Sequence, residues 1–168
     1  ATLRIGQIPS FSLAVDTTSL DEDGGGVVTA TITLNNAVTG QSSTVDFSTV
    51  DGTATQAGND FGGIVTLGET QSVTLDENTT TTTRTIAVTN DTPSVWEGPE
   101  TFSVRLTNPD IASAIVGAVE GVFAIEITID DPADVPTVSI GDAAGTEGGN
   151  VVLPVTVTGR TAFAASVD

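Results

Sequence analysis

Acidic side chains stand in short groups beside turn residues along much of the chain. The groups are Asp21-Glu22-Asp23, Asp60, Asn90-Asp91, Glu97 with Glu100, and Asp130-Asp131 with Asp134. Carboxylates that a fold brings together repel one another and raise each other's pKa, unless a divalent cation offsets their charge. Ca²⁺ takes about six to eight oxygen ligands, which carboxylates and loop carbonyls supply, whereas Mg²⁺ requires a tighter octahedral arrangement. These residue types therefore favour a calcium site, with magnesium as the second choice.

The same acids can also be explained without a metal. Acidic turns are commonly just solvated, and a high negative charge keeps proteins soluble at high salt. The stretch from Leu20 to Gly26 resembles an EF-hand loop only superficially, because the alternating acids and the glutamate at the twelfth position do not follow. Paired carboxylates could serve a glycosidase, but every acid here has a simpler explanation, and we expect no enzyme activity.

The composition excludes several other kinds of chemistry. The chain has 168 residues, with 22 Asp and Glu against 4 Lys and Arg, no His and no Cys, and a net charge of −18. Without His or Cys there is no thiol nucleophile, no His-assisted catalysis and no His/Cys zinc site. Four positive charges cannot neutralise a phosphate backbone, so we expect no nucleic-acid partner. The apolar stretches are far shorter than the about 20 residues that span a bilayer, so we expect no membrane insertion.

The elements that must position these acids are short strands, because apolar and polar residues alternate. The clearest segments are Val27–Leu34, Phe102–Leu106 and Phe123–Ile129, and further candidates are Phe11–Val15, Val45–Thr49, Ser72–Leu75 and Thr85–Val88. Alternation of period two is typical of strands with one buried side. With 38% hydrophobic and only 15% charged residues, a folded chain is favoured over a disordered acidic one. About seven short strands separated by turn residues predict an all-β sandwich.

The chain also begins to repeat itself. Phe11-Ser12-Leu13 reappears in type as Val138-Ser139-Ile140, and the apolar positions of the strand from Val28 to Leu34 reappear between Val151 and Val157. We therefore predict a linker or the end of a preceding segment at residues 1–9, a sandwich at 10–132, a linker at 133–137, and the first strands of a second, truncated repeat at 138–168. Two strands cannot bury their sheet face alone, so the second repeat is expected to pair with another chain or to be poorly ordered.

One run of residues resembles a known family. The segment from Phe47 to Phe61, FSTVDGTATQAGNDF, is similar to the DGTAxAGxDY signature of the Calx-beta domain. The similarity continues in order with Glu22 before a glycine turn, Asn90-Asp91-Thr92, the segment EGPETF from Glu97, the segment LTNP from Leu106, and the segment ITIDD that ends at Asp131. It covers residues 11–131 as one domain and the opening strands of another from residue 138.

The resemblance implies an immunoglobulin-like, antiparallel β-sandwich of about seven strands that binds Ca²⁺ at one end, near the junction with the next domain. Carried over position by position, the implied calcium ligands are Glu22, Asp60, Asp91, Glu97, Glu100, Asp130 and Asp131. The chain departs from the family pattern at Asn90 and Pro132, where acids are usual, and through Pro93-Ser94, which lengthen a turn by about two residues. Asp134 stands close enough in sequence to reach the site. Fewer ions or weaker binding are the expected consequence.

These observations together predict a calcium-binding structural module of a repetitive protein, in which Ca²⁺ stiffens loops and the junction between repeats. By analogy, such an array would be the stalk or spacer of a secreted bacterial adhesin at the cell surface, with neighbouring repeats of the same chain and a cell-surface or matrix molecule as partners. Two alternatives stay open: a metal-free sandwich that binds a protein or glycan, and a calcium sensor that regulates a membrane transporter. For Trp96, the lone Trp, packing over the end of the sandwich is favoured over a ligand platform.

Overall fold

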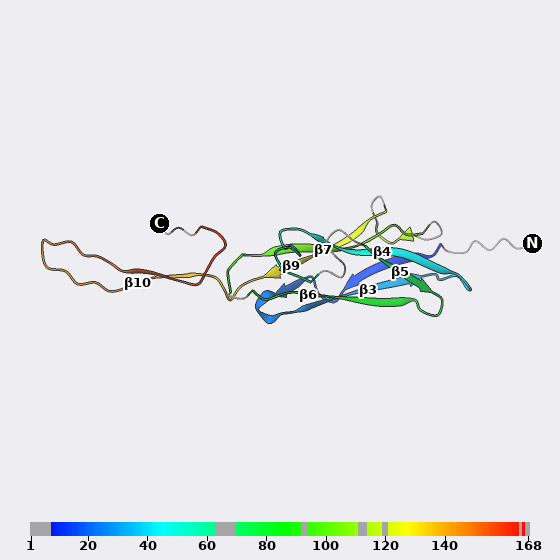
Figure 1. Ribbon diagram of the computed structural model, residues 1–168, viewed down its shortest axis with the longest axis horizontal. Helices are drawn as coiled ribbons and strands as arrows, with labels where there is room; N and C mark the ends of the chain where they lie inside the picture. Colours follow the sequence, from blue (N-terminus) through cyan, green and yellow to red (C-terminus); the bar gives the residue numbers. More distant parts are fainter. Residues whose placement is uncertain are drawn as a thin grey trace, which may run out of the picture.

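The protein is described from a computed structural model, in which residues 8–62, 70–91, 94–110, 114–118, 121–164 and 166 are described. They form a β-sandwich of two sheets, from which a two-stranded hairpin projects at one end (Figure 1). The first sheet has the order β6-β3-β1-β8 and the second β2-β9-β7-β4-β5. The strands of the sandwich are β1 Ser10–Val15, β2 Ser19–Asp21, β3 Val27–Asn35, β4 Ser42–Asp51, β5 Gln71–Asp76, β6 Thr81–Ala87, β7 Glu100–Thr107, β8 Ala114–Ile115 and β9 Phe123–Asp130. Across the described ranges, no helix has the length and apolar character needed to cross a bilayer.

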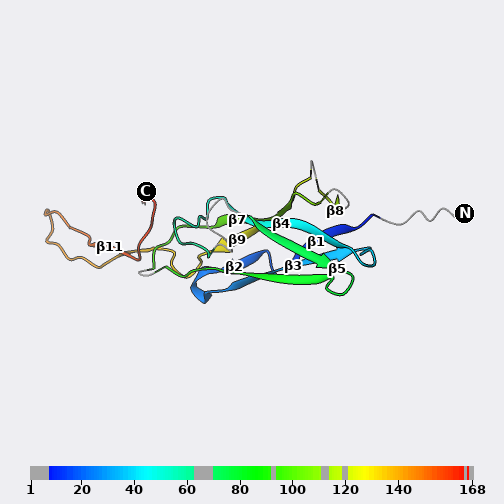
Figure 2. The ribbon, with the colours of Figure 1, turned by 45° about the vertical axis from the view of Figure 1, so that its right-hand side comes forward.

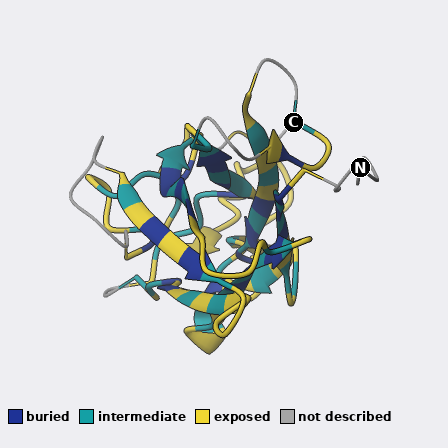
Figure 3. Ribbon diagram, turned by 90° about the vertical axis from the view of Figure 1, so that its right-hand side faces the viewer, coloured by how far each residue is buried: buried dark blue, intermediate teal, exposed yellow. Residues whose placement is uncertain are grey.

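Alternation along the strands builds the core between the two sheets. Every second residue of β3 is buried, from Val28 to Leu34, and β7 buries Phe102, Val104 and Leu106 in the same way. Figure 3, a view along the long axis, shows that the buried positions recur along the strands of both sheets. Phe61 and Phe102 stack within this core, with ring centroids 4.1 Å apart. The predicted all-β sandwich is confirmed. Six of the seven strand segments predicted from alternation lie within strands of the structure, and the seventh, Thr85–Val88, runs one residue past the end of β6.

Two further strands are too short to show any alternation. β8 pairs in parallel with the start of β1, and β2 pairs in parallel with the end of β9, with Ser19 opposite Thr128 and Asp21 opposite Asp130. All the other strand pairs are antiparallel within the described part of the chain. The parallel pair matters for the site because β2 and β9 end side by side, and acidic residues follow both.

The hairpin consists of β10 Thr137–Ile140 and β11 Val155–Thr158, and it extends away from the sandwich at the end opposite the start of β1 (Figures 1 and 2). In its register Val138 faces Val157 and Ile140 faces Val155. In the sandwich, Phe11 faces Leu34 and Leu13 faces Ile32 in the corresponding positions of β1 and β3. The hairpin thus has one apolar face, and its side chains are exposed, Ile140 to 65%. Of the segments predicted at the two ends, residues 1–7, 165, 167 and 168 lie outside the described residues.

Candidate metal centre

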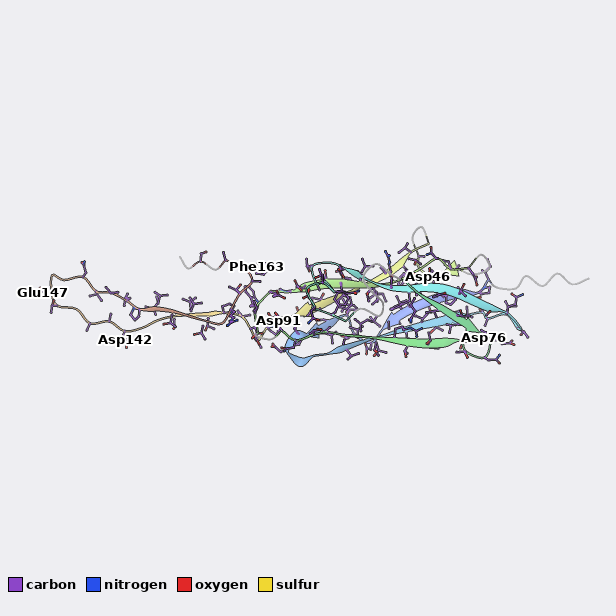
Figure 4. All side chains as sticks on the ribbon, viewed as in Figure 1. Asp46, Asp76, Asp91, Asp142, Glu147 and Phe163 are labelled. Atoms are coloured by element: carbon purple, nitrogen blue, oxygen red, sulfur yellow. The ribbon has the colours of Figure 1, made fainter. Side chains whose placement is uncertain are left out.

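The acidic residues predicted from the sequence gather at the end of the sandwich next to the hairpin. Asp91 marks this end in Figure 4, whereas Asp76 lies towards the other end. The first loop at this acidic end follows β2, where Glu22 opens a single 3-10 turn, Glu22–Gly24. The Asp21 side chain caps that turn by accepting a hydrogen bond from the backbone N–H of Asp23 at 3.1 Å. Gly25 ends it in the left-handed conformation, with φ of 55°, which glycine adopts without strain.

The second loop follows β4 and presents Asp60. The Asp60 carboxylate accepts a 2.6 Å hydrogen bond from the backbone N–H of Thr55, and the Thr55 hydroxyl accepts one from the N–H of Gly58. Gly58 is tightly enclosed here, because a Cβ added to it would lie 2.7 Å from Asp60 Oδ1 and 2.8 Å from Thr55 Oγ1. The glycine of the AGND segment therefore makes room for the carboxylate.

Glu97, in the loop before β7, and Glu100, the first residue of β7, lie close to Asp60. Carboxylate oxygens of these three residues lie within 4.8 Å of one another. Burial raises the pKa of Glu100 to about 7, assisted by the charges of Asp60 and Glu97 and by a hydrogen bond with Asp60. Burial also raises the pKa of Glu97, and the negative charges of Asp91, Asp60 and Asp131 add to this effect. We call Asp60, Glu97 and Glu100 the first cluster.

A second cluster joins Asp23, Asp131 and Asp134, whose carboxylate oxygens also lie within 4.8 Å of one another. Asp131 is only 5% exposed. Its Oδ2 accepts a hydrogen bond from the backbone N–H of Glu97 at 3.1 Å, while its Oδ1 is buried without a partner. Asp23 Oδ2 is buried without a partner as well. Burial raises the pKa of Asp131, and the charges of Asp134 and Asp23 contribute.

The charge of Glu22 interacts with members of both clusters. It is 8% exposed, and burial together with the charges of Asp91, Asp131 and Glu97 raises its pKa to about 7. A hydrogen bond from the backbone of Asp91 acts in the opposite direction and favours the charged form of Glu22. Asp91 therefore contacts the site through Glu22 and repels Glu97. Pro93, in the lengthened turn that follows, lies outside the described residues.

The membership of the clusters differs from the implied ligand set at Asp130 and at Asp23. Asp130, an implied ligand, is in neither cluster among the described residues, and its Oδ2 accepts a 2.6 Å hydrogen bond from the Ser19 hydroxyl across the β2–β9 pair. Asp23, which was not among the implied ligands, is in the second cluster, and Asp134 reaches it as well. The burial of Asp131 follows from the alternation of β9. Ile127 and Ile129 are buried, so the next position on the buried side is Asp131.

The donor set fits a hard divalent cation. Two buried carboxylate oxygens without partners are unusual, because a buried polar atom that makes no hydrogen bond costs about 1–3 kcal/mol. Several carboxylates with raised pKa in one place show that the fold concentrates negative charge there. A bound cation would offset both costs at once, and Ca²⁺ accepts oxygen ligands of this kind. Glu22 and the two clusters supply the carboxylates that would hold it.

Comparisons with known proteins agree with the architecture. The family described as Calx-beta domain matches residues 6–132. The apo form of the Calx CBD1 domain is similar to this chain with a TM-score of 0.53 and 23% identity, over 72% of this chain and 96% of that one. CBD12 from CALX1.2 gives 0.50 and 23%, over 71% and 43% of the two chains, and the Calx CBD2 domain gives 0.51 and 12%, over 73% and 88%. No curated protein sequence is close enough to count as a relative.

Proposed function

We propose that this chain, which belongs to the Calx-beta domain family, binds Ca²⁺ at its acidic end and serves as a structural module rather than a catalyst. The observation that carries the proposal is the pair of buried, unpartnered carboxylate oxygens of Asp23 and Asp131 within a group of acids of raised pKa. The proposed ligands are Glu22, Asp60, Asp91, Glu97, Glu100 and Asp131 from the sequence, joined by Asp23 and Asp134 from the geometry. Asp130 is proposed to support Ser19 instead.

Ca²⁺ supplies positive charge and oxygen coordination that would join loops from separate parts of the chain. Without it, Glu97 and Glu100 are repelled by Asp60, so the loop before β7 and the loop after β4 are pushed apart. Extracellular calcium modules bind with Kd on the order of 10⁻⁴–10⁻³ M, and this is the range expected here. Binding to the folded state alone would stabilise it by about 2.7 kcal/mol at a hundred times Kd.

The wider role that we propose is that of a repeat in a secreted, cell-surface array. The support is the hairpin, whose strands have the register of β1 and β3 and whose apolar face is open. The remaining strands of a second repeat would cover that face. The acidic end lies beside this hairpin, so bound Ca²⁺ would also stiffen the junction between repeats (Figure 4).

Thermal unfolding and calorimetry with increasing Ca²⁺ test the calcium site, with Mg²⁺ as the control ion. We expect Ca²⁺ to raise Tm at millimolar concentration and Mg²⁺ to raise it less, because Mg²⁺ needs a tighter octahedron. The double variant Asp60→Asn, Glu97→Gln should lose the calcium shift and yet unfold at a higher temperature than the wild type in EDTA, because repulsion is relieved.

Glu126→Gln is the matched control, since Glu126 is an exposed carboxylate on β9 outside both clusters. It should keep the full calcium shift. A wild-type chain with no stabilisation and no binding heat at millimolar Ca²⁺ would show that the acidic end is not a calcium site.

A further inference from the structure

The turn that joins β5 to β6 carries a sequence pattern for which the calcium site has no use. It reads Asp76-Glu77-Asn78-Thr79-Thr80. An asparagine followed two positions later by Ser or Thr, with no proline between them, is the acceptor pattern for N-linked glycosylation of exported proteins. The oligosaccharyltransferases of bacteria also require an acidic residue two positions before the asparagine, and Asp76 stands there. The turn therefore meets both the short pattern and the longer one.

A second asparagine of the chain meets only the short pattern. Asn90 is followed by Asp91 and Thr92, but the buried Val88 stands two positions before it. Asn90 also adjoins Asp91 at the acidic end, whereas Asp76 lies towards the opposite end of the sandwich (Figure 4). A transferase that reads the longer pattern would thus distinguish Asn78 from Asn90.

The side chain of Asn78 is accessible and unengaged. Residues 77–80 are all exposed. Their backbone is held by Asp76, whose Oδ1 accepts hydrogen bonds from the N–H groups of Asn78 at 2.8 Å and Thr79 at 2.7 Å. Across the part of the chain that the structure describes, the side-chain amide of Asn78 makes no hydrogen bond. An amide nitrogen is a weak nucleophile because its lone pair is delocalised, so an acceptor amide must be free for the enzyme to orient.

The turn can enter an enzyme groove without disturbing the core. Residues 77–80 bury no apolar side chain. Besides the bonds to Asp76 Oδ1, the turn is closed by the Asp76 N–H on the Thr79 carbonyl at 3.1 Å and by the Leu34 N–H on the Thr80 carbonyl at 2.7 Å. Exposed segments of this kind open locally at a much lower free energy than the whole domain. The acceptor is therefore usable after the sandwich has folded.

A polar hollow beside Asn78 offers room for the first sugar. It has a volume of about 260 Å³ and lies between this turn and the start of β4, where it is lined by Gly40, Gln41, Ser42, Asp76, Glu77 and Asn78. Hydroxyl, amide and carboxylate groups of this lining can donate to and accept from the hydroxyls of a sugar. The hollow suits a hydroxyl-rich ligand rather than an apolar one.

We propose that Asn78 accepts an N-linked oligosaccharide on the folded, exported chain. Asn78 Nδ2 forms a bond to C1 of the reducing-end sugar of a polyprenyl-diphosphate-linked oligosaccharide. The bond from C1 to the diphosphate oxygen breaks, polyprenyl diphosphate leaves, and one amide proton passes to a base of the transferase. The modification needs the export that is part of the proposed function, but it does not need calcium binding. The glycan projects from the end of the sandwich that faces away from the acidic end.

The test combines the purified full chain with a bacterial oligosaccharyltransferase and a polyprenyl-diphosphate-linked oligosaccharide. Intact-mass spectrometry counts the glycans, peptide mapping locates them, and a standard acceptor peptide verifies that the enzyme is active. We expect one oligosaccharide on Asn78 of the wild type and none on Asn78→Gln. A folded chain that receives no glycan would overturn the proposal, whether or not a peptide of residues 74–82 is modified. So would a glycan that persists on another residue in Asn78→Gln at the wild-type rate.

Conservative variants separate recognition of the pattern from the shape of the turn. Asp76→Asn removes the charge but keeps a side-chain oxygen that can accept from the N–H groups of residues 78 and 79, and it should lose transfer. Thr80→Ala should lose transfer and Thr80→Ser should keep it, because the hydroxyl is the group that the enzyme reads.

Two controls separate this proposal from the calcium site. Asn90→Gln should be glycosylated at the wild-type rate, since Asn90 lacks the preceding acid. The double variant Asp60→Asn, Glu97→Gln should also be glycosylated like the wild type, because both residues belong to the first cluster and not to the turn. Transfer to a chain that binds no calcium would support the glycan site while the proposed function fails. Calcium binding without transfer would overturn the glycan site alone.

Discussion

At the scale of single residues, the junction of β9 with the linker separates two chemically identical side chains. The pleat of the strand sends Asp130 towards Ser19 on β2, where its carboxylate accepts a hydrogen bond. Asp131 follows the phase of Ile127 and Ile129 into the interior and arrives there as a buried carboxylate with one unpartnered oxygen. A difference of one position in register thus decides which acid is a surface hydrogen-bond acceptor and which is a candidate ligand.

The pair offers a matched test of the site. Asp131→Asn should weaken calcium binding by about tenfold or more, which is about 1.4 kcal/mol or more, because it removes a buried charge from the second cluster. Asp130→Asn should leave the calcium Kd unchanged and cost at most about 1 kcal/mol of folding stability, since it only weakens the bond from Ser19. Calorimetry and thermal unfolding of both variants measure this, and equal losses of affinity would place Asp130 in the site after all.

At the scale of elements, the site depends on loops that are held by their own backbone and not by the strands alone. The loop after β4 is an example, because Thr55 binds both Asp60 and Gly58 and sets the direction of the carboxylate. Beneath it, Phe61 stacks on Phe102, so the residues that follow Asp60 and Glu100 are fixed in the core. The first cluster therefore lies next to packed side chains of the core, with Asp60 and Glu97 in loops and Glu100 at the start of β7.

Gly58, in the loop after β4, allows a test of how this loop positions Asp60. Gly58→Ala should lower the calcium affinity by about tenfold and lower Tm, because the new Cβ would lie 2.7 Å from Asp60 Oδ1 and must displace that carboxylate. Gly24→Ala is the control in the neighbouring loop, where a Cβ would meet no atom within 4 Å. It should keep the affinity and be neutral or stabilising by about 0.4–1 kcal/mol. Calorimetry on both variants decides, and unchanged affinity in Gly58→Ala would contradict the assignment of Asp60.

Alternation in the sequence was sufficient to predict the long strands, because every second residue of β3, β7 and β9 is more buried than its neighbours over most of each strand. It could not predict β2 or β8, since three residues and two residues are too few to show a period, and their pairing is supplied by β9 and β1. For the site, the family resemblance pointed to Glu22 and Asp60, which the structure brings to the same end of the sandwich. Asp23 was not predicted because its approach to Asp131 depends on the turn that Gly25 closes.

At the scale of the whole molecule, the net charge of −18 affects folding stability mainly through the acids at the acidic end. The acids at the acidic end repel one another where their side chains are partly buried. Glu22 and Glu100 have pKa values of about 7 in the folded protein against an ordinary 4.5. Between these values the folded protein binds more protons than the unfolded chain, so its stability falls as the pH rises. The raised pKa values of Glu97 and Asp131 act in the same direction.

The fall of folding stability with rising pH can be tested by thermal unfolding at several pH values. In EDTA, Tm should fall by several degrees between pH 5 and pH 8, as Glu22 and Glu100 lose their protons. Saturating Ca²⁺ should restore Tm at pH 8 and have a smaller effect at pH 5, where protons compete with the cation for the carboxylates. The variant Glu22→Gln, Glu100→Gln should show a flatter profile in EDTA. Differential scanning calorimetry across this range is the measurement, and a Tm that rises with pH in EDTA would refute the repulsion described here.

The parallel pairing of β2 with β9 has a mechanical consequence. β1 begins near one end of the long axis and β9 leaves the sandwich at the other, so a pull on the chain draws β1 and β9 in opposite directions (Figure 1). The pairs Ser19–Thr128, Leu20–Ile129 and Asp21–Asp130 then lie across the line of force and must give way together in shear, not one after another. Glu22 and Asp131 follow directly behind these pairs, so a cation held by them would sit at the point where the two strands begin to slide. Resistance to stretching, a property of the unfolding rate and not of equilibrium stability, would then rise with calcium.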